Sequence, residues 1–80
     1  MQVVIYGRQG CTYCDLAKDL LNARQLSYEY IDINEDFDAA MDFKKKFGVI
    51  KSVPQILVDN KLVGGYNSLL SFLDKETNDE

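Results

Sequence analysis

Two cysteines are the residues best suited to chemistry in this 80-residue chain. Cys11 and Cys14 are separated only by Thr12 and Tyr13. On a helix this spacing puts both sulfur-bearing side chains on one face, one turn apart. One thiolate can then form a mixed disulfide with a substrate, and the other can resolve it. The pair therefore predicts a thiol–disulfide oxidoreductase.

The residues around the pair predict that Cys11 is the N-cap of a helix. A short β-rich run, Gln2 to Tyr6, precedes it, and helical spacing begins at Thr12. The free backbone N–H groups of Tyr13 and Cys14 can then hydrogen-bond its sulfur, and the positive end of the helix dipole favours the thiolate. Cysteines so placed have a pKa lowered from the ordinary value of about 8.5.

Two charged neighbours modify this expectation. Arg8 adds a positive charge three residues upstream of Cys11, whereas Asp15 acts in the opposite sense. We therefore expect a moderate lowering of the Cys11 pKa, and burial of Cys14 under the first turn would keep its own pKa high. Cys11 is expected to be the exposed nucleophile and Cys14 the resolving thiol.

The rest of the composition excludes several other chemistries. The chain has no histidine, so it lacks Ser-His-Asp and Cys-His catalysis, and two cysteines alone cannot complete a tetrahedral zinc site. No metal site is predicted within one chain, although two chains could share a metal or cluster. A purely stabilising disulfide is the other alternative. It would close a very short loop and would be reduced in a cytosol.

Charge and hydropathy argue against nucleic acid and membrane partners. The net charge is −4, and the one basic cluster, Lys44 to Lys46, fits the C-terminal end of a helix. No apolar run approaches the ~20 residues of a membrane span. The N-terminus lacks the layout of a signal peptide, so a cytoplasmic location is expected.

The predicted elements form a small α/β domain. Apolar alternation and helical periodicity predict strands at 2–6, 27–33, 55–58 and 61–63, and helices at 12–23, at about 36–47, and after a cap at Asn67. A frayed acidic tail is expected over 76–80. Asp59 and Asn60 predict a tight hairpin turn. The order β-α-β-α-β-β-α predicts a mixed four-stranded sheet with helices on both faces.

Two loops could complete a site beside the cysteines. Pro54, the only proline, precedes a strand. A cis Val53–Pro54 bond would leave the Val53 backbone free to pair with an extended ligand, but Pro54 could equally just begin a strand. Gly64-Gly65 allows close backbone approach, and the helix start after it can bind a carboxylate. A plain strand-to-helix turn explains this segment equally well.

These motifs together resemble the glutaredoxin family. The resemblance rests on Cys-Thr-Tyr-Cys at 11–14, Ser-Val-Pro-Gln at 52–55 and Val-Gly-Gly at 63–65, in that order before the last helix. It implies a single glutaredoxin domain over 1–80 with a thioredoxin-like fold. It also implies a monomer that binds no cofactor and uses glutathione as co-substrate. The implied activity is reduction of protein disulfides and glutathione mixed disulfides, with ribonucleotide reductase as a possible protein substrate.

The resemblance also assigns roles to residues. Cys11 is implied to be the nucleophile and Cys14 the resolving thiol. The residues implied to contact glutathione or substrate are Arg8, Thr12, Tyr13, Val53, Pro54, Gly65, Tyr66, Asn67 and Ser68. Two positions depart from the family pattern: Thr12 replaces the usual proline, and Ser68 replaces an aspartate that meets the γ-glutamyl ammonium.

Two alternative functions stay open at the level of sequence. The first is a glutaredoxin-like electron donor recharged by thioredoxin reductase, which the missing aspartate favours. The second is a binding module in which two chains share an iron–sulfur cluster through Cys11 and glutathione. The Arg8 and Gly-Gly-Tyr-Asn features favour the glutathione-dependent enzyme over both.

Overall fold

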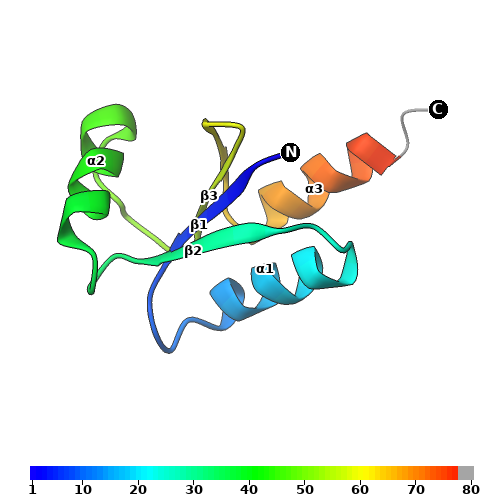
Figure 1. Cartoon of the computed structure of the whole chain (residues 1–80), viewed down its shortest axis with the longest axis horizontal. Helices are drawn as coiled ribbons and strands as arrows, with labels where there is room; N and C mark the ends of the chain where they lie inside the picture. The colour runs from blue at the N-terminus through cyan, green and yellow to red at the C-terminus, as the bar shows by residue number, and fades with distance from the viewer. Residues whose placement is uncertain (78–80) are drawn as a thin grey trace.

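A mixed four-stranded sheet organises the molecule in the computed structural model, which describes the backbone of residues 1–77 (Figure 1). The strand order is β2 (Tyr28–Asp32), β1 (Val3–Gly7), β3 (Gln55–Val58) and β4 (Lys61–Gly64). β1 runs parallel to β2 and antiparallel to β3, and β3 pairs antiparallel with β4. The predicted mixed sheet and its element order are confirmed.

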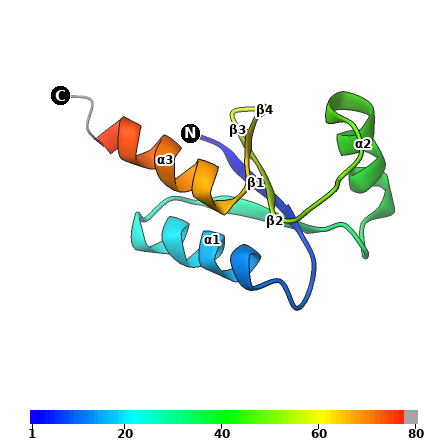
Figure 2. The same cartoon turned by 180° about the vertical axis from the view of Figure 1, so that it is seen from behind.

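Three helices cover both faces of this sheet. α1 (Thr12–Ala23) and α3 (Tyr66–Thr77) lie on one face, and α2 (Phe37–Phe47) lies on the other (Figures 1 and 2). The fold is thus the predicted thioredoxin-like arrangement β-α-β-α-β-β-α.

Each face has its own apolar core. Beneath α1 and α3 the sheet contributes Ile5 and Ile56, both without exposed surface, and these pack with Leu21 and Leu69. Beneath α2 the core is smaller and aromatic: the ring centroids of Tyr6 and Phe43 are 5.0 Å apart. The larger core therefore fixes α1, which carries the two cysteines, to the centre of the sheet.

Local turn chemistry explains the connections. Asp59 and Asn60 have φ values of 52° and 69°, which confirms the tight hairpin turn between β3 and β4. Asp36 is the N-cap of α2, and its carboxylate accepts a hydrogen bond from the Ala39 N–H at 3.0 Å. Gly48 ends that helix with φ 97°, a conformation that favours glycine.

The last helix differs from its prediction at both ends. It begins at Tyr66, so Gly65 precedes it and Asn67 lies in its first turn; the predicted cap at Asn67 is wrong. The N–H of Leu69 already bonds to the Gly65 carbonyl at 3.0 Å, which starts the helix earlier. The helix also continues to Thr77, so the predicted frayed tail begins too early. Residues 78–80 of that tail lie outside the described residues.

Within residues 1–77, none of the helices has the length and apolar character needed to cross a bilayer.

Candidate active site

The two cysteines lie where β1 gives way to α1 and are joined by a disulfide, with their Cα atoms 5.2 Å apart. Cys11 has extended backbone angles (φ −102°, ψ 106°) and is the N-cap of α1, as predicted. Its sulfur accepts a hydrogen bond from the Cys14 N–H at 3.1 Å. The second predicted bond, from the Tyr13 N–H, is absent among the described contacts. One backbone donor and the helix dipole therefore act on the Cys11 sulfur.

The two sulfurs differ in access to solvent, though less than expected. Cys14 has no exposed surface, whereas Cys11 retains 9 %. The sequence predicted an exposed Cys11, and the structure corrects this to a largely buried residue with one accessible edge. Its position as N-cap, between the β1 loop and Val53, removes most of its surface. Cys11 is nevertheless the only one of the two cysteines whose side chain can react with a second molecule.

Gly7 closes the inner side of the disulfide. A methyl group added at this glycine would lie 2.7 Å from the Cys14 sulfur and 2.9 Å from the Tyr30 hydroxyl oxygen. Both contacts are too short for real side chains, so only glycine fits between Cys14 and β2 at this point. The close approach of β1 to the helix therefore seals Cys14 from water.

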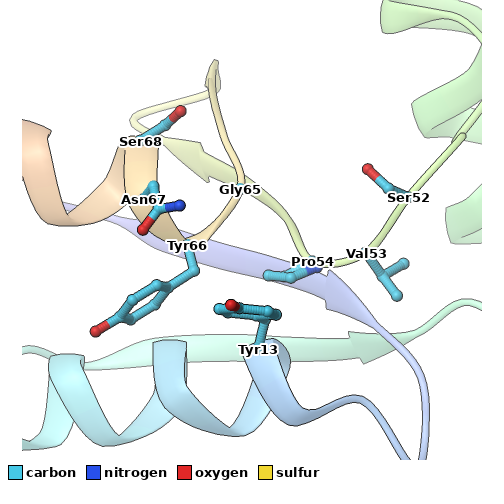
Figure 3. A pocket seen from close by; sticks show the side chains of 8 residues that line it. All are labelled: Tyr13, Ser52, Val53, Pro54, Gly65, Tyr66, Asn67 and Ser68. Carbon is cyan, nitrogen blue, oxygen red and sulfur yellow. The ribbon is translucent and has the colours of Figure 1, made fainter.

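A pocket of about 330 Å³ is lined by Tyr13, which with Thr12 separates the two cysteines, and by Val53, whose carbonyl oxygen lies 3.8 Å from the Cys11 sulfur (Figure 3). We call it the main pocket; α1, the loop before β3 and the start of α3 contribute to it. Its lining residues are Tyr13, Ser52, Val53, Pro54, Gly65, Tyr66, Asn67 and Ser68. Seven of these eight were singled out from the sequence as contact residues, although they come from three separate segments of the chain.

Aromatic rings form one wall of the main pocket. The ring centroids of Tyr13 and Tyr66 are 5.9 Å apart with an interplanar angle of 41°. In Figure 3 the two rings lie next to each other, and Pro54 lies against the Tyr13 side of the pair. Tyr13 is 55 % exposed. It therefore borders the pocket and keeps more than half of its surface open to solvent.

The loop before β3 contributes backbone to the main pocket. The Val53–Pro54 peptide bond is cis. The Val53 carbonyl oxygen lies 3.8 Å from the Cys11 sulfur. Gln55 fixes the preceding loop, because its side-chain amide donates to the Ser52 carbonyl at 2.9 Å. An extended ligand whose sulfur meets Cys11 would therefore run alongside the backbone of Val53.

The first turn of α3 points its free N–H groups at the other end of the main pocket. Helix N-termini with unbonded N–H groups attract carboxylates. Gly64 precedes this turn with φ 127°, and a methyl group there would lie 2.8 Å from the Ser68 hydroxyl oxygen. At Gly65 a methyl group would meet only the Pro54 carbonyl, at an ordinary 3.6 Å. Close packing therefore requires glycine at position 64 and leaves room at position 65.

Two of the predicted contact residues lie outside the main pocket. Arg8 borders a smaller hollow of about 120 Å³; we call it the Arg8 hollow. Its lining residues are Arg8, Ile33, Ile50, Lys51, Ser52 and Val53. Thr12, the first residue of α1, is exposed and lines neither hollow. Val53 and Ser52 border both.

Comparison with known proteins decides the family. The family model for glutaredoxins matches residues 3–63 of this chain. The chain belongs to the glutaredoxin family. It is 41 % identical over 79 residues to glutaredoxin 1 of Escherichia coli, covering 91 % of this chain and 93 % of the relative. This glutaredoxin is therefore a thiol–disulfide oxidoreductase with a Cys11/Cys14 active site.

Solved structures agree with this glutaredoxin over nearly its whole length. The structure of reduced E. coli glutaredoxin superimposes with a TM-score of 0.74 at 37 % identity, covering 98 % of this chain and 99 % of that one. A buckwheat glutaredoxin–glutathione complex superimposes with a TM-score of 0.76, at 21 % identity, over 92 % of this chain and 69 % of that one. The second likeness shows the shared fold alone.

Sequence reasoning missed several residues of this glutaredoxin site. Ser52 lines both hollows and Lys51 lines the Arg8 hollow, and their position next to the Val-Pro step was the available clue. Gly7 was not among the residues predicted to form the site. Its contact with the Cys14 sulfur depends on how closely α1 packs on the sheet, which no local pattern encodes.

Proposed function

We propose that this glutaredoxin uses glutathione to reduce protein disulfides and glutathione mixed disulfides. The observation that carries the proposal is the location of the Cys11 sulfur, 3.8 Å from the carbonyl oxygen of Val53, a residue that lines both hollows. Glutathione has a central cysteine and a carboxylate at each end. A tripeptide bound through its cysteine at Cys11 can extend into the main pocket one way and into the Arg8 hollow the other.

Each end of glutathione finds suitable chemistry in this arrangement. The γ-glutamyl carboxylate suits the free N–H groups of the first turn of α3, at Tyr66, Asn67 and Ser68. The glycine carboxylate suits the Arg8 and Lys51 side chains, which supply two positive charges around one small hollow. The buckwheat glutaredoxin, which shares this fold, has been solved in complex with glutathione.

The remaining contacts of the proposed site are apolar or neutral. Tyr13 and Pro54 would cover the cysteinyl part of the ligand, and the Val53 backbone would pair with its amide groups. Gly65 leaves space for the γ-glutamyl chain, since a methyl group there would protrude beside the Pro54 carbonyl. Thr12 lies beside Cys11 on the exposed turn, where it would touch an incoming protein disulfide.

The proposed reaction has two steps. The Cys11 thiolate attacks one sulfur of the substrate disulfide, so that a mixed disulfide forms and the other substrate sulfur leaves as a thiolate that takes up a proton. With a protein disulfide, Cys14 attacks the Cys11 sulfur and releases the second substrate thiol. With a glutathione mixed disulfide, a second glutathione attacks the glutathionyl sulfur bound to Cys11 and leaves as glutathione disulfide, which frees the Cys11 thiolate. Two molecules of glutathione finally reduce the Cys11–Cys14 disulfide and become glutathione disulfide.

The physiological setting is part of the proposal. We expect a cytoplasmic monomer that acts on disulfide-containing proteins, ribonucleotide reductase being one possibility, and that does not bind nucleic acid or membranes. The 80 residues are expected to act as one glutaredoxin domain.

The test is turnover of a small mixed disulfide with two alternative electron sources. We expect NADPH consumption with glutathione and glutathione reductase, and little with thioredoxin reductase alone. If turnover occurs only with thioredoxin reductase, then that enzyme, and not glutathione, is the electron source. An absorbance band above 400 nm in freshly purified dimer would instead favour the shared iron–sulfur cluster.

A further inference from the structure

The resolving step poses an electrostatic problem at Cys14. This cysteine has no exposed surface. Burial disfavours the thiolate, yet only a thiolate attacks the Cys11 mixed disulfide efficiently. The chain has no histidine, and no charged side chain is fully buried within the described residues. Stabilisation of the Cys14 thiolate by a side-chain charge would therefore have to come from the edge of the buried region.

Tyr30 reaches the inner side of Cys14 from β2. Its hydroxyl oxygen and the Cys14 sulfur would both touch the same methyl group added at Gly7, so the two atoms are near neighbours. The hydroxyl donates to the Arg8 carbonyl at 3.2 Å, which ties the ring to the loop before Cys11. The ring is thus held in one place beside the buried sulfur.

Lys18 places its charge on that ring. Its ammonium nitrogen lies 3.7 Å from the centroid of the Tyr30 ring, a close cation–π contact. Lys18 follows Cys14 by four residues in α1, so both side chains leave the same face of the helix. The half-buried Lys18 therefore holds its positive charge on the Cys14 side of α1.

We propose that Lys18, positioned by the ring of Tyr30, stabilises the Cys14 thiolate in the resolving step. This rests on the proposed function, because it assumes that Cys14 resolves the mixed disulfide at Cys11. The Cys14 thiolate attacks the Cys11 sulfur, the Cys11–Cys14 bond forms, the bond from Cys11 to the substrate sulfur breaks, and the proton that Cys14 has lost goes to the departing substrate sulfur. The substrate sulfur leaves with the electron pair.

The other ionisable groups around Cys14 leave Lys18 as the favourable one on this side. Asp15 on α1 and Asp32 on β2 are negative and oppose a thiolate. Arg8 carries its charge toward the Arg8 hollow. Burial, together with Asp32 and Asp15, raises the pKa of the Tyr30 hydroxyl, so that group stays neutral at physiological pH.

The first test measures the reactivity of Cys14 alone. In a Cys11→Ser background, the alkylation rate of Cys14 is followed against pH, with and without Lys18→Met. We expect the midpoint to move to higher pH and the rate at neutral pH to fall about three- to tenfold, since each pKa unit is a factor of ten in thiolate. Lys18→Arg should restore most of the rate. Lys46→Met, at the far end of α2, is the matched control.

The second test examines Tyr30 and the complete reaction. Tyr30→Leu should slow reduction of a protein disulfide as Lys18→Met does, whereas Tyr30→Phe, which keeps the ring, should retain most of the rate. In a Cys14→Ser background Lys18→Met should have no further effect. Suppose the parent protein turns over glutathione mixed disulfides. If Lys18→Met then leaves the pH dependence of Cys14 alkylation unchanged, this inference is overturned and the proposed function is not. A parent without such turnover would instead contradict the proposed function.

Discussion

The sulfur of Cys11 lies 3.8 Å from the carbonyl oxygen of Val53, although the two residues are 42 positions apart in the chain. This contact joins the helix that carries the disulfide to the loop that ends at Pro54. Val53 lines both the main pocket and the Arg8 hollow, so the Cys11 sulfur contacts a residue that the two hollows share. The site thus offers one sulfur and two binding regions for a ligand that extends in both directions.

The two cysteines are expected to titrate differently. The helix N-terminus and the Cys14 N–H act on the Cys11 sulfur, so the pKa of Cys11 should lie below that of the fully buried Cys14. Iodoacetamide alkylation of the reduced protein against pH, read at each cysteine by mass spectrometry, measures both. Equal midpoints for the two residues would contradict an activated Cys11.

Ser68→Asp should lower the KM for glutathione. The new carboxylate would lie in the first turn of α3, at the edge of the main pocket, where the γ-glutamyl ammonium is expected. A partly exposed charge-assisted contact of about 0.5–1.4 kcal/mol corresponds to roughly a two- to tenfold change, and salt should weaken it. Steady-state assays at low and high ionic strength measure the change.

Ser71→Asp is the matched control for that experiment. Ser71 lies one turn further along α3 and borders the neighbouring groove, not the main pocket. Ser71→Asp adds the same charge to the same helix. Because Ser71 does not line the main pocket, the KM for glutathione should stay nearly unchanged. Equal effects of the two variants, or no effect of Ser68→Asp, would mean that glutathione does not bind along Gly65 to Ser68.

Gly7→Ala should destabilise the fold and impair the dithiol. The added methyl group would lie 2.7 Å from the Cys14 sulfur and 2.9 Å from the Tyr30 hydroxyl, so α1 or β2 must shift. Overpacking of this kind costs about 1–3 kcal/mol. Urea unfolding measures the loss, with Gly65→Ala as the control, since a methyl group there meets an ordinary 3.6 Å contact. Equal stability of the Gly7→Ala and parental proteins would disprove the tight packing.

Sequence patterns predicted the fold well because helix and strand periodicity is local. The apolar stripe of 12–23 and the Asp59-Asn60 turn each specify one element, and both are confirmed. The start of α3 was misplaced by the capping preference of Asn67, which Gly65 overrides as the residue before the helix. The end of β4 at Gly64 decides where the helix can begin, and the capping preference of one residue does not override it.

Non-local packing accounts for what the sequence could not reveal of the site. The main pocket joins residues that three separate motifs had already marked, so most of its lining was predictable. The roles of Gly7, Lys18 and Tyr30 depend on how α1 lies on β1 and β2, and no motif contains all three. Arg8 was expected to flank the ligand; it lines the Arg8 hollow, which shares Ser52 and Val53 with the main pocket.

Alkaline pH should destabilise the protein through Tyr6. Burial raises the pKa of its hydroxyl above 10.0, with Asp42 and Glu29 acting in the same sense. The pKa in the folded state therefore exceeds that in the unfolded state. The stabilisation it provides is complete below pH 10 and is lost as pH rises through the folded-state pKa. Tyr6→Phe should show a smaller loss of unfolding free energy above pH 10, and an equal loss would exclude Tyr6 as its source.

Trapping the glutathionylated intermediate tests the central claim most directly. Cys14→Ser lacks the resolving thiol, so reaction with glutathione disulfide should leave one glutathionyl group on Cys11, located by peptide mass spectrometry. The same variant should still turn over glutathione mixed disulfides but lose reduction of protein disulfides, and Cys11→Ser should lose both activities. A Cys11→Ser protein that stays active, or that carries the glutathionyl group on Cys14, would contradict the assignment of Cys11 as the nucleophile.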